Sequence, residues 1–256
     1  MKLHYVIALL IVLSSCARKS LKYDSKLMWE QNFMQQDNLD EWRINNNTFY
    51  GNNETLFLSE NVFLTDSGLI VLCKDSVGIA TTWQKTDTFL HTGGNMTTWG
   101  DNFSGQEFTG RLIEIEMKVP DSWSAFWLLK IPRVIESTGR VHSVPEIDIG
   151  ENNGNKVDFC VHWGYSKMAY SAYSFVHKAH RPDGEFHRYA VRLLKDGYEF
   201  YLDGKLSKKY EQRKMHGGQL VDFYAPYYMI ITNAGDKNRF RFDETQLIIK
   251  WIKMYK

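Results

Sequence analysis

The sequence predicts an all-β protein, and three observations support this fold class. Short runs of alternating apolar and polar residues recur along the chain, with the period of a half-buried strand. Turn dipeptides such as Asp196-Gly197 and Asp203-Gly204 separate several of these runs. Aromatic residues, which favour strands, make up 14% of the chain, whereas convincing helical periodicity is scarce.

The individual elements follow in chain order. The turn Asp66-Ser67-Gly68 predicts a hairpin, and in 111–119 the residues Ile113, Ile115, Met117 and Val119 alternate with charged ones. A meander is expected near the C-terminal end, followed by a closing strand, and residues 207–216 suggest one short helical turn. The expected strands are 61–64, 69–73, 111–119, 187–194, 198–202, a run from 205 onward and 247–255.

Composition narrows the possible functions only moderately. The 256 residues carry 31 Lys and Arg against 30 Asp and Glu, with 43% hydrophobic residues, which is typical of an ordinary globular chain. A formal net charge of +1 argues against a nucleic-acid binder that depends on neutralising phosphates. The aromatic residues fit a β-rich core or a cleft lined with flat rings, and composition leaves both open.

The N-terminus is expected to be a targeting segment. Lys2 precedes an apolar run from Tyr5 to Leu13, which is too short to span a bilayer. Leu13-Ser14-Ser15-Cys16 resembles the lipobox of bacterial lipoproteins, so we expect a signal peptide over 1–15 and a lipidated Cys16 that begins a tether over 16–27. This predicts a protein anchored by lipid in the bacterial cell envelope, at the outer membrane and facing the periplasm or the surface. A plain secretory signal is the alternative.

Two cysteines then remain, Cys73 and Cys160. Export permits a disulfide, but two lone cysteines are weak grounds for one, and buried free thiols are at least as good an expectation.

Three carboxylates lie within six positions, in Glu146-Ile147-Asp148-Ile149-Gly150-Glu151. On a strand Glu146 and Asp148 share a face, whereas Glu151 has the opposite parity and would point into the core. A β-bulge with Gly150 as its extra residue restores the parity and places all three acids on one side. Carboxyls of the two glutamates could then reach the separation of about 5–5.5 Å that retaining glycosidases use.

Three carboxylates this close together repel one another when ionised, so we expect them to differ in protonation state. At least one proton is retained near neutral pH; on the outermost glutamate it would give a general acid, while the opposite glutamate stays ionised as a nucleophile and Asp148 between them can accept or share a proton. An acidic strand face open to water, or a calcium site, remains the alternative for the spacing alone.

The segment Glu146–Glu151 matches the E-x-D-x-x-E signature of glycoside hydrolase family 16, the laminarinase, agarase and carrageenase group. The resemblance extends over residues 28–256, because other segments resemble family landmarks in the same order. These are Phe108–Arg111 with Trp123–Leu129, Glu185–Val191 with Phe200–Gly204, and Trp251–Tyr255. The resemblance implies a catalytic domain over 28–256 with a β-jelly-roll (concanavalin A-like) sandwich of two antiparallel sheets and an open cleft on the concave sheet.

The resemblance also implies roles for single residues. Glu146 corresponds to the nucleophile, Glu151 to the acid/base and Asp148 to the assisting carboxylate. Many relatives carry a bulky apolar residue where Gly150 stands, so we expect Gly150 to leave a packing gap that could loosen the aim of Glu151. Trp123-Ser124-Ala125 replaces the usual Trp-Pro-Ala.

Strand parity adds residues that would bind substrate. If 157–163 pairs beside the carboxylate strand, His162 faces the cleft together with Asp158 and Cys160, and a neutral His162 could bond a carboxylate or a sugar hydroxyl. Trp123 and Trp127 share a face and could stack on sugar rings, with core packing as the alternative. Trp99 and Trp163 lie near loops or strand ends and are candidates for the cleft rim.

Together these features predict a retaining endo-acting glycosidase that cleaves internal β-glycosidic bonds of a polysaccharide, with a slight preference for neutral substrates. β-Glucans, galactans and mucin-type chains all fit the family. A transglycosylase, or a glycan-binding surface lipoprotein without catalysis, is the alternative. We expect catalysis to need no cofactor, with a structural calcium possible and no catalytic metal. The expected partners are the polysaccharide and, through Cys16, a membrane, without nucleic acid, and the protein is expected to be a monomer.

Overall fold

The computed structural model describes residues 20–23, 26–35, 38–49, 54–81, 86–99, 111–131, 133–135, 140–142, 146–154, 156–163, 173–195, 197–211, 227–236 and 238–256. The described residues form strands and one short 3-10 helix, η1 (Ser59–Asn61), so the predicted all-β class is confirmed. The expected signal peptide, Cys16 and the start of the expected tether lie outside these residues. No helix among the described residues is long and apolar enough to cross a bilayer.

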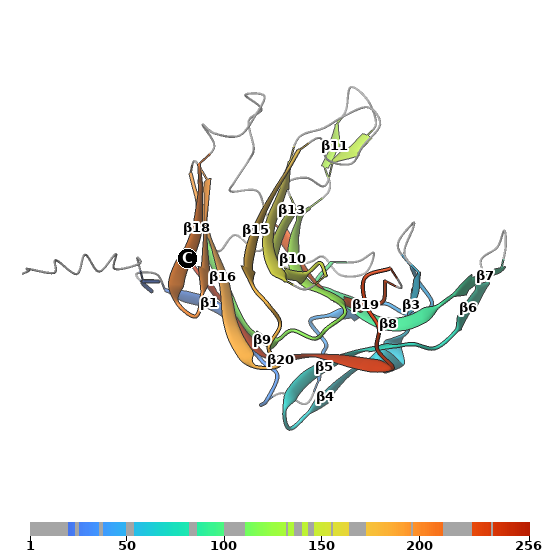
Figure 1. The fold of residues 1–256 in the computed structure, drawn as a ribbon. Helices are drawn as coiled ribbons and strands as arrows, with labels where there is room; N and C mark the ends of the chain where they lie inside the picture. Colours follow the sequence, from blue (N-terminus) through green and yellow to red (C-terminus); the bar gives the residue numbers. More distant parts are fainter. Residues whose placement is uncertain are drawn as a thin grey trace, which may run out of the picture.

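One long sheet curls back on itself to form two facing halves (Figure 1). The first half runs, in spatial order, through β15 (Tyr173–His180), β14 (Val157–Trp163), β13 (Glu146–Asn152), β10 (Trp123–Lys130), β19 (Tyr227–Ala234) and β8 (His91–Thr97). The second continues through β5 (Gly68–Lys74), β20 (Glu244–Tyr255), β9 (Leu112–Lys118), β16 (Phe186–Leu194), β17 (Gly197–Leu202) and β18 (Lys205–Glu211). Neighbouring strands on this path are antiparallel, and a short pairing of β5 with β8 joins the two expected sheets.

Shorter strands flank this path. β1 (Leu27–Asn32) pairs with β20, and β4 (Val62–Thr65) pairs with β5. β2 (Arg43–Ile44) pairs with β8, as does β3 (Thr55–Phe57), the latter in parallel. Two separate hairpins are β6 (Gly78–Thr81) with β7 (Thr86–Phe89), and β11 (Arg133–Ile135) with β12 (Arg140–His142).

The core fills the space between the two halves, as the alternation of the strands predicts. Ile147 and Ile149 of β13 pack in one buried cluster with Ile115 of β9 and with Tyr189 and Val191 of β16. Because side chains alternate along a strand, Glu146 and Asp148 lie on the opposite face of β13. The core therefore determines which face of this half carries the acids.

Two of the hairpin turns are confirmed; β16 and β17 also pair as a hairpin, but Gly197 pairs with Leu194 as the first residue of β17, and Asp196 lies outside the described residues. The helical turn is wrong over 207–211, the described part of 207–216. β4 and β5 flank Asp66-Ser67, with Gly68 as the first residue of β5, and Asp203 and Gly204 take φ of 50° and 72° between β17 and β18, as a two-residue hairpin turn requires. Residues 207–211, expected to be helical, belong instead to β18. The Asp203-Gly204 turn places them along β17, where ladder pairs such as Tyr198 with Tyr210 decide the conformation.

Part of the predicted tether packs against the sheet. The Leu21 N–H donates to the Gly204 carbonyl at 2.7 Å, and the Leu21 side chain joins a small buried cluster with Leu112 and Tyr201. The Tyr23 hydroxyl lies 2.9 and 3.0 Å from the two carboxylate oxygens of Glu114. Glu114 is only 2% exposed although alternation along β9 predicts a solvent-facing position, because this N-terminal segment covers it.

Candidate active site

The three acids of β13 lie on one face of the strand, and a bulge at Gly150 makes this possible. Gly150 has φ of +107°, and the register of β13 against β14 shifts between Ile149 and Glu151. Glu151 consequently pairs with Asp158 of β14, whereas a regular strand would have turned it toward the core. The bulge predicted from parity is therefore present at the predicted residue.

No packing gap exists at Gly150, contrary to the expectation from the resemblance. A Cβ atom at this position would lie 2.5 Å from Cε of Met117 and 3.2 Å from a ring carbon of Tyr189. These two core side chains already occupy the space. The positive φ requires a glycine here, and a Cβ would fit only if the Met117 side chain shifted, so the bulge that aims Glu151 is closely packed.

Electrostatics separates Glu151 from an ordinary carboxylate. Burial, followed by the nearby charge of Asp148, raises the pKa of Glu151 to about 7, although the Trp123 N–H and His162 act in the opposite direction. Trp123 Nε1 donates to Glu151 Oε1 at 2.7 Å. A carboxyl with this pKa is protonated in a large fraction of molecules at neutral pH, as a general acid must be.

His162 lies between the other two acids and is positioned by β14. Its Nε2 atom is 3.4 Å from Asp148 Oδ2 and 3.8 Å from Glu146 Oε1, because Glu146 and His162 are cross-strand partners. Burial lowers the pKa of His162, but the hydrogen bond and charge of Asp148, with the charge of Glu146, outweigh it and leave the pKa raised. The neighbouring acids therefore shift His162 toward its charged form, whereas sequence reasoning considered a neutral ring.

Cys160 and Asp158 complete the β14 side of the same face. Cys160 pairs with Asp148, and its Sγ lies 3.2 Å from His162 Nε2. Both Cys160 and Cys73 are buried free cysteines, in agreement with the expectation of unpaired thiols. Asp158 is 4% exposed, and burial is the largest of the effects that raise its pKa.

The predicted tryptophans on β10 also reach this face. Trp127 is the cross-strand partner of Asp148, and its Nε1 donates to Thr232 Oγ1 at 3.2 Å. Trp123 and Trp127 are both half-buried, so each retains exposed surface that a flat sugar ring can contact. Trp99 stacks on Tyr228, with ring centroids 5.9 Å apart. Trp163 belongs to β14, but its side chain lies outside the described part of the structure.

Three residues of this face were missed by sequence reasoning: Tyr228, Thr232 and Asn95. Tyr228 shares a cross-strand row with Leu129 and Glu146, and Asn95 Nδ2 donates to Thr232 Oγ1 at 2.8 Å. No motif marks them in the sequence. They reach the site only because β19 and β8 happen to be the next strands in the sheet, which the sequence order conceals.

Comparison with known proteins places this geometry in a family. The family model for glycosyl hydrolases family 16 matches residues 75–253, a span that contains all three acids of β13. A search among curated proteins found no match.

Solved structures share the fold at low sequence identity. The laminarinase catalytic domain from Thermotoga maritima superposes with a TM-score of 0.69 at 22% identity, covering 91% of this chain and 98% of the other. The catalytic domain of an endo-1,3-β-glucanase (laminarinase) from Thermotoga petrophila gives a TM-score of 0.70 at 23% identity, covering 92% and 99%. A structure from work on endo-acting O-glycanases of the human gut microbiota gives 0.70 at 19%, covering 93% of both chains.

These neighbours confirm the predicted jelly-roll fold. The family model covers more than half of the chain and includes the strand that bears the three carboxylates. The chain therefore belongs to glycosyl hydrolase family 16, a family of endo-glycosidases that hydrolyse O-glycosyl bonds.

Proposed function

We propose that this protein is a retaining endo-glycanase in which Glu146 is the nucleophile, Glu151 the acid/base and Asp148 the assisting carboxylate. The observation that carries the proposal is the Gly150 bulge, which aligns the acids on one face while burial raises the pKa of Glu151 to about 7. A retaining glycosidase needs this combination of an ionised nucleophile and a protonated acid, which flank the scissile bond.

The chemistry proceeds in two displacements. The Glu151 carboxyl gives its proton to the glycosidic oxygen while a Glu146 carboxylate oxygen attacks the anomeric carbon, which breaks the bond to the leaving sugar. Glu151, now ionised, takes a proton from water, and the resulting hydroxyl attacks the anomeric carbon and frees Glu146. His162 Nε2 lies 3.4 Å from Asp148 and 3.8 Å from Glu146, so this ring lies beside both the assisting carboxylate and the proposed nucleophile.

The substrate is a β-linked polysaccharide, for which we favour a neutral glucan or galactan. The half-buried faces of Trp123 and Trp127 and the stacked pair of Trp99 and Tyr228 provide flat apolar surfaces along the row of acids. Such surfaces suit the apolar faces of sugar rings, whereas sulfated galactans would require fixed cations. Laminarinases and the mucin O-glycanase work among the structural neighbours support β-glucans and mucin-type chains as the first substrates to test.

The test begins with a reducing-end screen of the purified protein against neutral and sulfated polysaccharides. On the substrate found, Glu146→Gln is expected to remove hydrolysis, whereas Glu60→Gln, an exposed position on η1, keeps wild-type rates. Glu151→Ala is expected to cut an aryl glycoside with a good leaving group far better than the polysaccharide, because such a leaving group needs no proton. NMR of the first product must show the retained anomer.

Other outcomes of the same screen identify the alternatives. Binding to a glycan without new reducing ends on any glycan would indicate a glycan-binding lipoprotein and not an enzyme. Longer products at high acceptor concentration would indicate transglycosylation, in which a sugar hydroxyl takes the place of water. Full activity of Glu146→Gln would refute the assigned nucleophile.

We further propose that Cys16 carries the lipid that holds the protein in the bacterial cell envelope. The support is the sequence Leu13-Ser14-Ser15-Cys16 after an apolar run. Labelled fatty acid should be incorporated into the wild-type chain and not into Cys16→Ser, and only the wild type should sediment with membranes. Release of both forms into the soluble fraction would contradict the anchor.

A further inference from the structure

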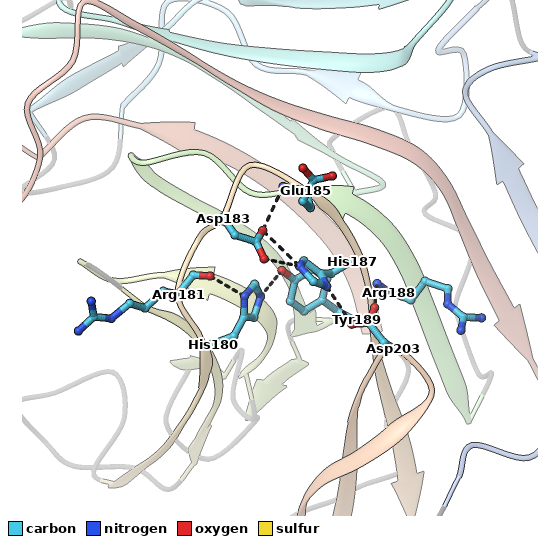
Figure 2. Close-up of polar contacts among 8 residues, drawn as sticks. All are labelled: His180, Arg181, Asp183, Glu185, His187, Arg188, Tyr189 and Asp203. Atoms are coloured by element: carbon cyan, nitrogen blue, oxygen red, sulfur yellow. Dashed lines mark hydrogen bonds and ion pairs between the residues drawn. The ribbon is translucent and has the colours of Figure 1, made fainter.

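A second cluster of metal-ligating side chains lies where β15 leads into β16 (Figure 2). Among the described residues, two groups each bring three ligand atoms within 4.8 Å of one another. The first is Asp148, Cys160 and His162, beside the three acids of β13, and we call this region the acid row. The second is His180, Asp183 and His187. The second group is separate from the first. His180 pairs with Val157, a residue of the core, whereas the acids lie on the opposite face of the sheet.

Both imidazole rings of the second group are oriented by acceptors on their Nδ1 atoms. His180 Nδ1 lies 2.6 Å from the carbonyl oxygen of Arg181, which can only accept, so this nitrogen carries the hydrogen. The Nε2 atom of His180 is left with a free electron pair, which accepts from the Tyr189 hydroxyl at 2.7 Å. His187 Nδ1 lies 2.8 Å from Asp203 Oδ2.

These contacts are the ones that support metal-binding histidines. In metal sites a ligating imidazole usually donates its other N–H to a carboxylate or a backbone carbonyl, which fixes the ring and its tautomer. Here Asp203 and the Arg181 carbonyl provide one support of each kind. Asp203 is itself held, because its Oδ1 accepts from the Arg188 N–H at 3.0 Å.

The remaining geometry suits a tetrahedral cation. His187 Nε2 lies 3.0 and 3.2 Å from the two carboxylate oxygens of Asp183. Ligand distances of about 2.0–2.1 Å around tetrahedral zinc place neighbouring ligand atoms about 3.3 Å apart. The side chain of Asp183 is 49% exposed and that of His187 is 20% exposed, so a hydrated ion can approach.

We propose that His180, Asp183 and His187 form a binding site for a divalent transition-metal cation of the zinc class, with Asp203 and the Arg181 carbonyl orienting the two imidazoles. Two imidazoles and a carboxylate are ligands that suit zinc better than calcium or magnesium. When the cation binds, the proton on His187 Nε2 passes to solvent and His180 Nε2 exchanges the Tyr189 hydroxyl for the metal. Water takes the fourth position.

The proposed site would act as a clamp, and it goes beyond the proposed glycanase activity. It would join the end of β15, an outermost strand of the half that bears the acids, to β16 in the other half. Asp203 adds the β17–β18 turn to the same unit. Because the cation binds only the folded arrangement of these ligands, the melting temperature should rise with its concentration.

The test is a calorimetric titration of untagged, chelator-treated protein with Zn²⁺, in parallel with Ca²⁺ and Mg²⁺. We expect one Zn²⁺ per chain, a higher melting temperature with Zn²⁺, and little response to the other two ions. His180→Gln and Asp183→Asn should each weaken Zn²⁺ binding more than tenfold, and Asp203→Asn about 10- to 100-fold through ring orientation. Matched controls are His177→Gln, on the same strand, and Asp66→Asn, in an exposed turn.

Co²⁺ distinguishes this site from the acid row. Bound at the proposed ligands it should show no thiolate charge-transfer band, and Cys160→Ala should leave its spectrum unchanged. The proposal is overturned if Zn²⁺ fails to bind one to one, or if affinity survives both His180→Gln and Asp183→Asn. It is equally overturned by a thiolate band that disappears in Cys160→Ala, which would place the metal in the acid row. These readouts do not depend on glycanase activity, so the two proposals can fail separately.

Discussion

Replacing Trp123 by Phe should move the pKa of Glu151 upward and with it the alkaline limb of the pH–activity profile. In the wild type the indole N–H donates to Glu151 at 2.7 Å and favours the ionised carboxylate. Phe keeps an aromatic ring for sugar stacking but removes this donor. The charged form of Glu151 then loses a partner, so its proton is held to higher pH.

The expected shift follows from the strength of this bond. A hydrogen bond to a charged group contributes about 1.5–3 kcal/mol, and one pKa unit corresponds to about 1.4 kcal/mol, which gives about 1–2 units. Glu151 is only half-buried, so water can replace part of the lost bond, and we expect a shift of about one unit. The midpoint of the alkaline limb of the kcat/KM profile should lie near pH 7 for the wild type and move toward pH 8 in Trp123→Phe.

Two assays and one control decide the result. The kcat/KM profile reports the free enzyme, and NMR titration of labelled glutamate carboxyls reports Glu151 without any substrate. Trp127→Phe is the matched control, since its indole donates to the Thr232 hydroxyl, and its profile should keep the wild-type limb. A limb that stays in place or moves to lower pH in a folded Trp123→Phe variant would refute this account of Glu151.

Three further predictions concern stability. Gly150→Ala should lower the free energy of unfolding by about 2–4 kcal/mol through strain and overpacking, and it should also lower kcat. Gly154 has φ of +85° but room for a Cβ, so Gly154→Ala should lower the free energy of unfolding in urea by only about 1–2 kcal/mol. Equal losses in the two variants would contradict the packing argument. Tyr23→Phe should cost about 1–3 kcal/mol in the same assay, because it removes a donor from the buried carboxylate of Glu114, and an unchanged midpoint would show that this segment is dispensable. The pKa of His162 is raised in the folded protein, so its contribution to stability is complete below the unfolded pKa of about 6.5 and is lost as pH rises through the folded value. The stability difference between wild type and His162→Gln should accordingly be larger at pH 5.5 than at pH 9, and a difference that grows with pH would reverse this sign.

Sequence reasoning succeeded where a local rule was strong. The period-two pattern of β9 and β13 and the Asp203-Gly204 turn follow from backbone geometry over a few residues, and they were predicted correctly. The parity conflict at Glu151 required a bulge, and Gly150 was the residue that could form it. The expected helical turn failed over its described residues, 207–211, because the ladder along β17 outweighs weak local preference.

Residues brought together over long sequence distances could not be predicted in the same way. Tyr228 and Thr232 belong to a strand about eighty residues beyond the acids, and no sequence pattern identifies β19 as the neighbour of β10. Glu114 has the parity of a solvent-facing residue, and only the docking of Tyr23 buries it. The packing at Gly150 depends on Met117 and Tyr189, which arrive from the facing half of the sheet.

The sequence by itself determined several of the strands, the row of three acids and the need for a glycine bulge, because each of these depends on alternation within a single segment. The tertiary structure decided which strands border the row, how strongly burial and Trp123 set the protonation of Glu151, and that His180, Asp183 and His187 converge with Asp203. Those outcomes depend on distances across the sheet and on the removal of water. Both are fixed only when the two halves close on one core.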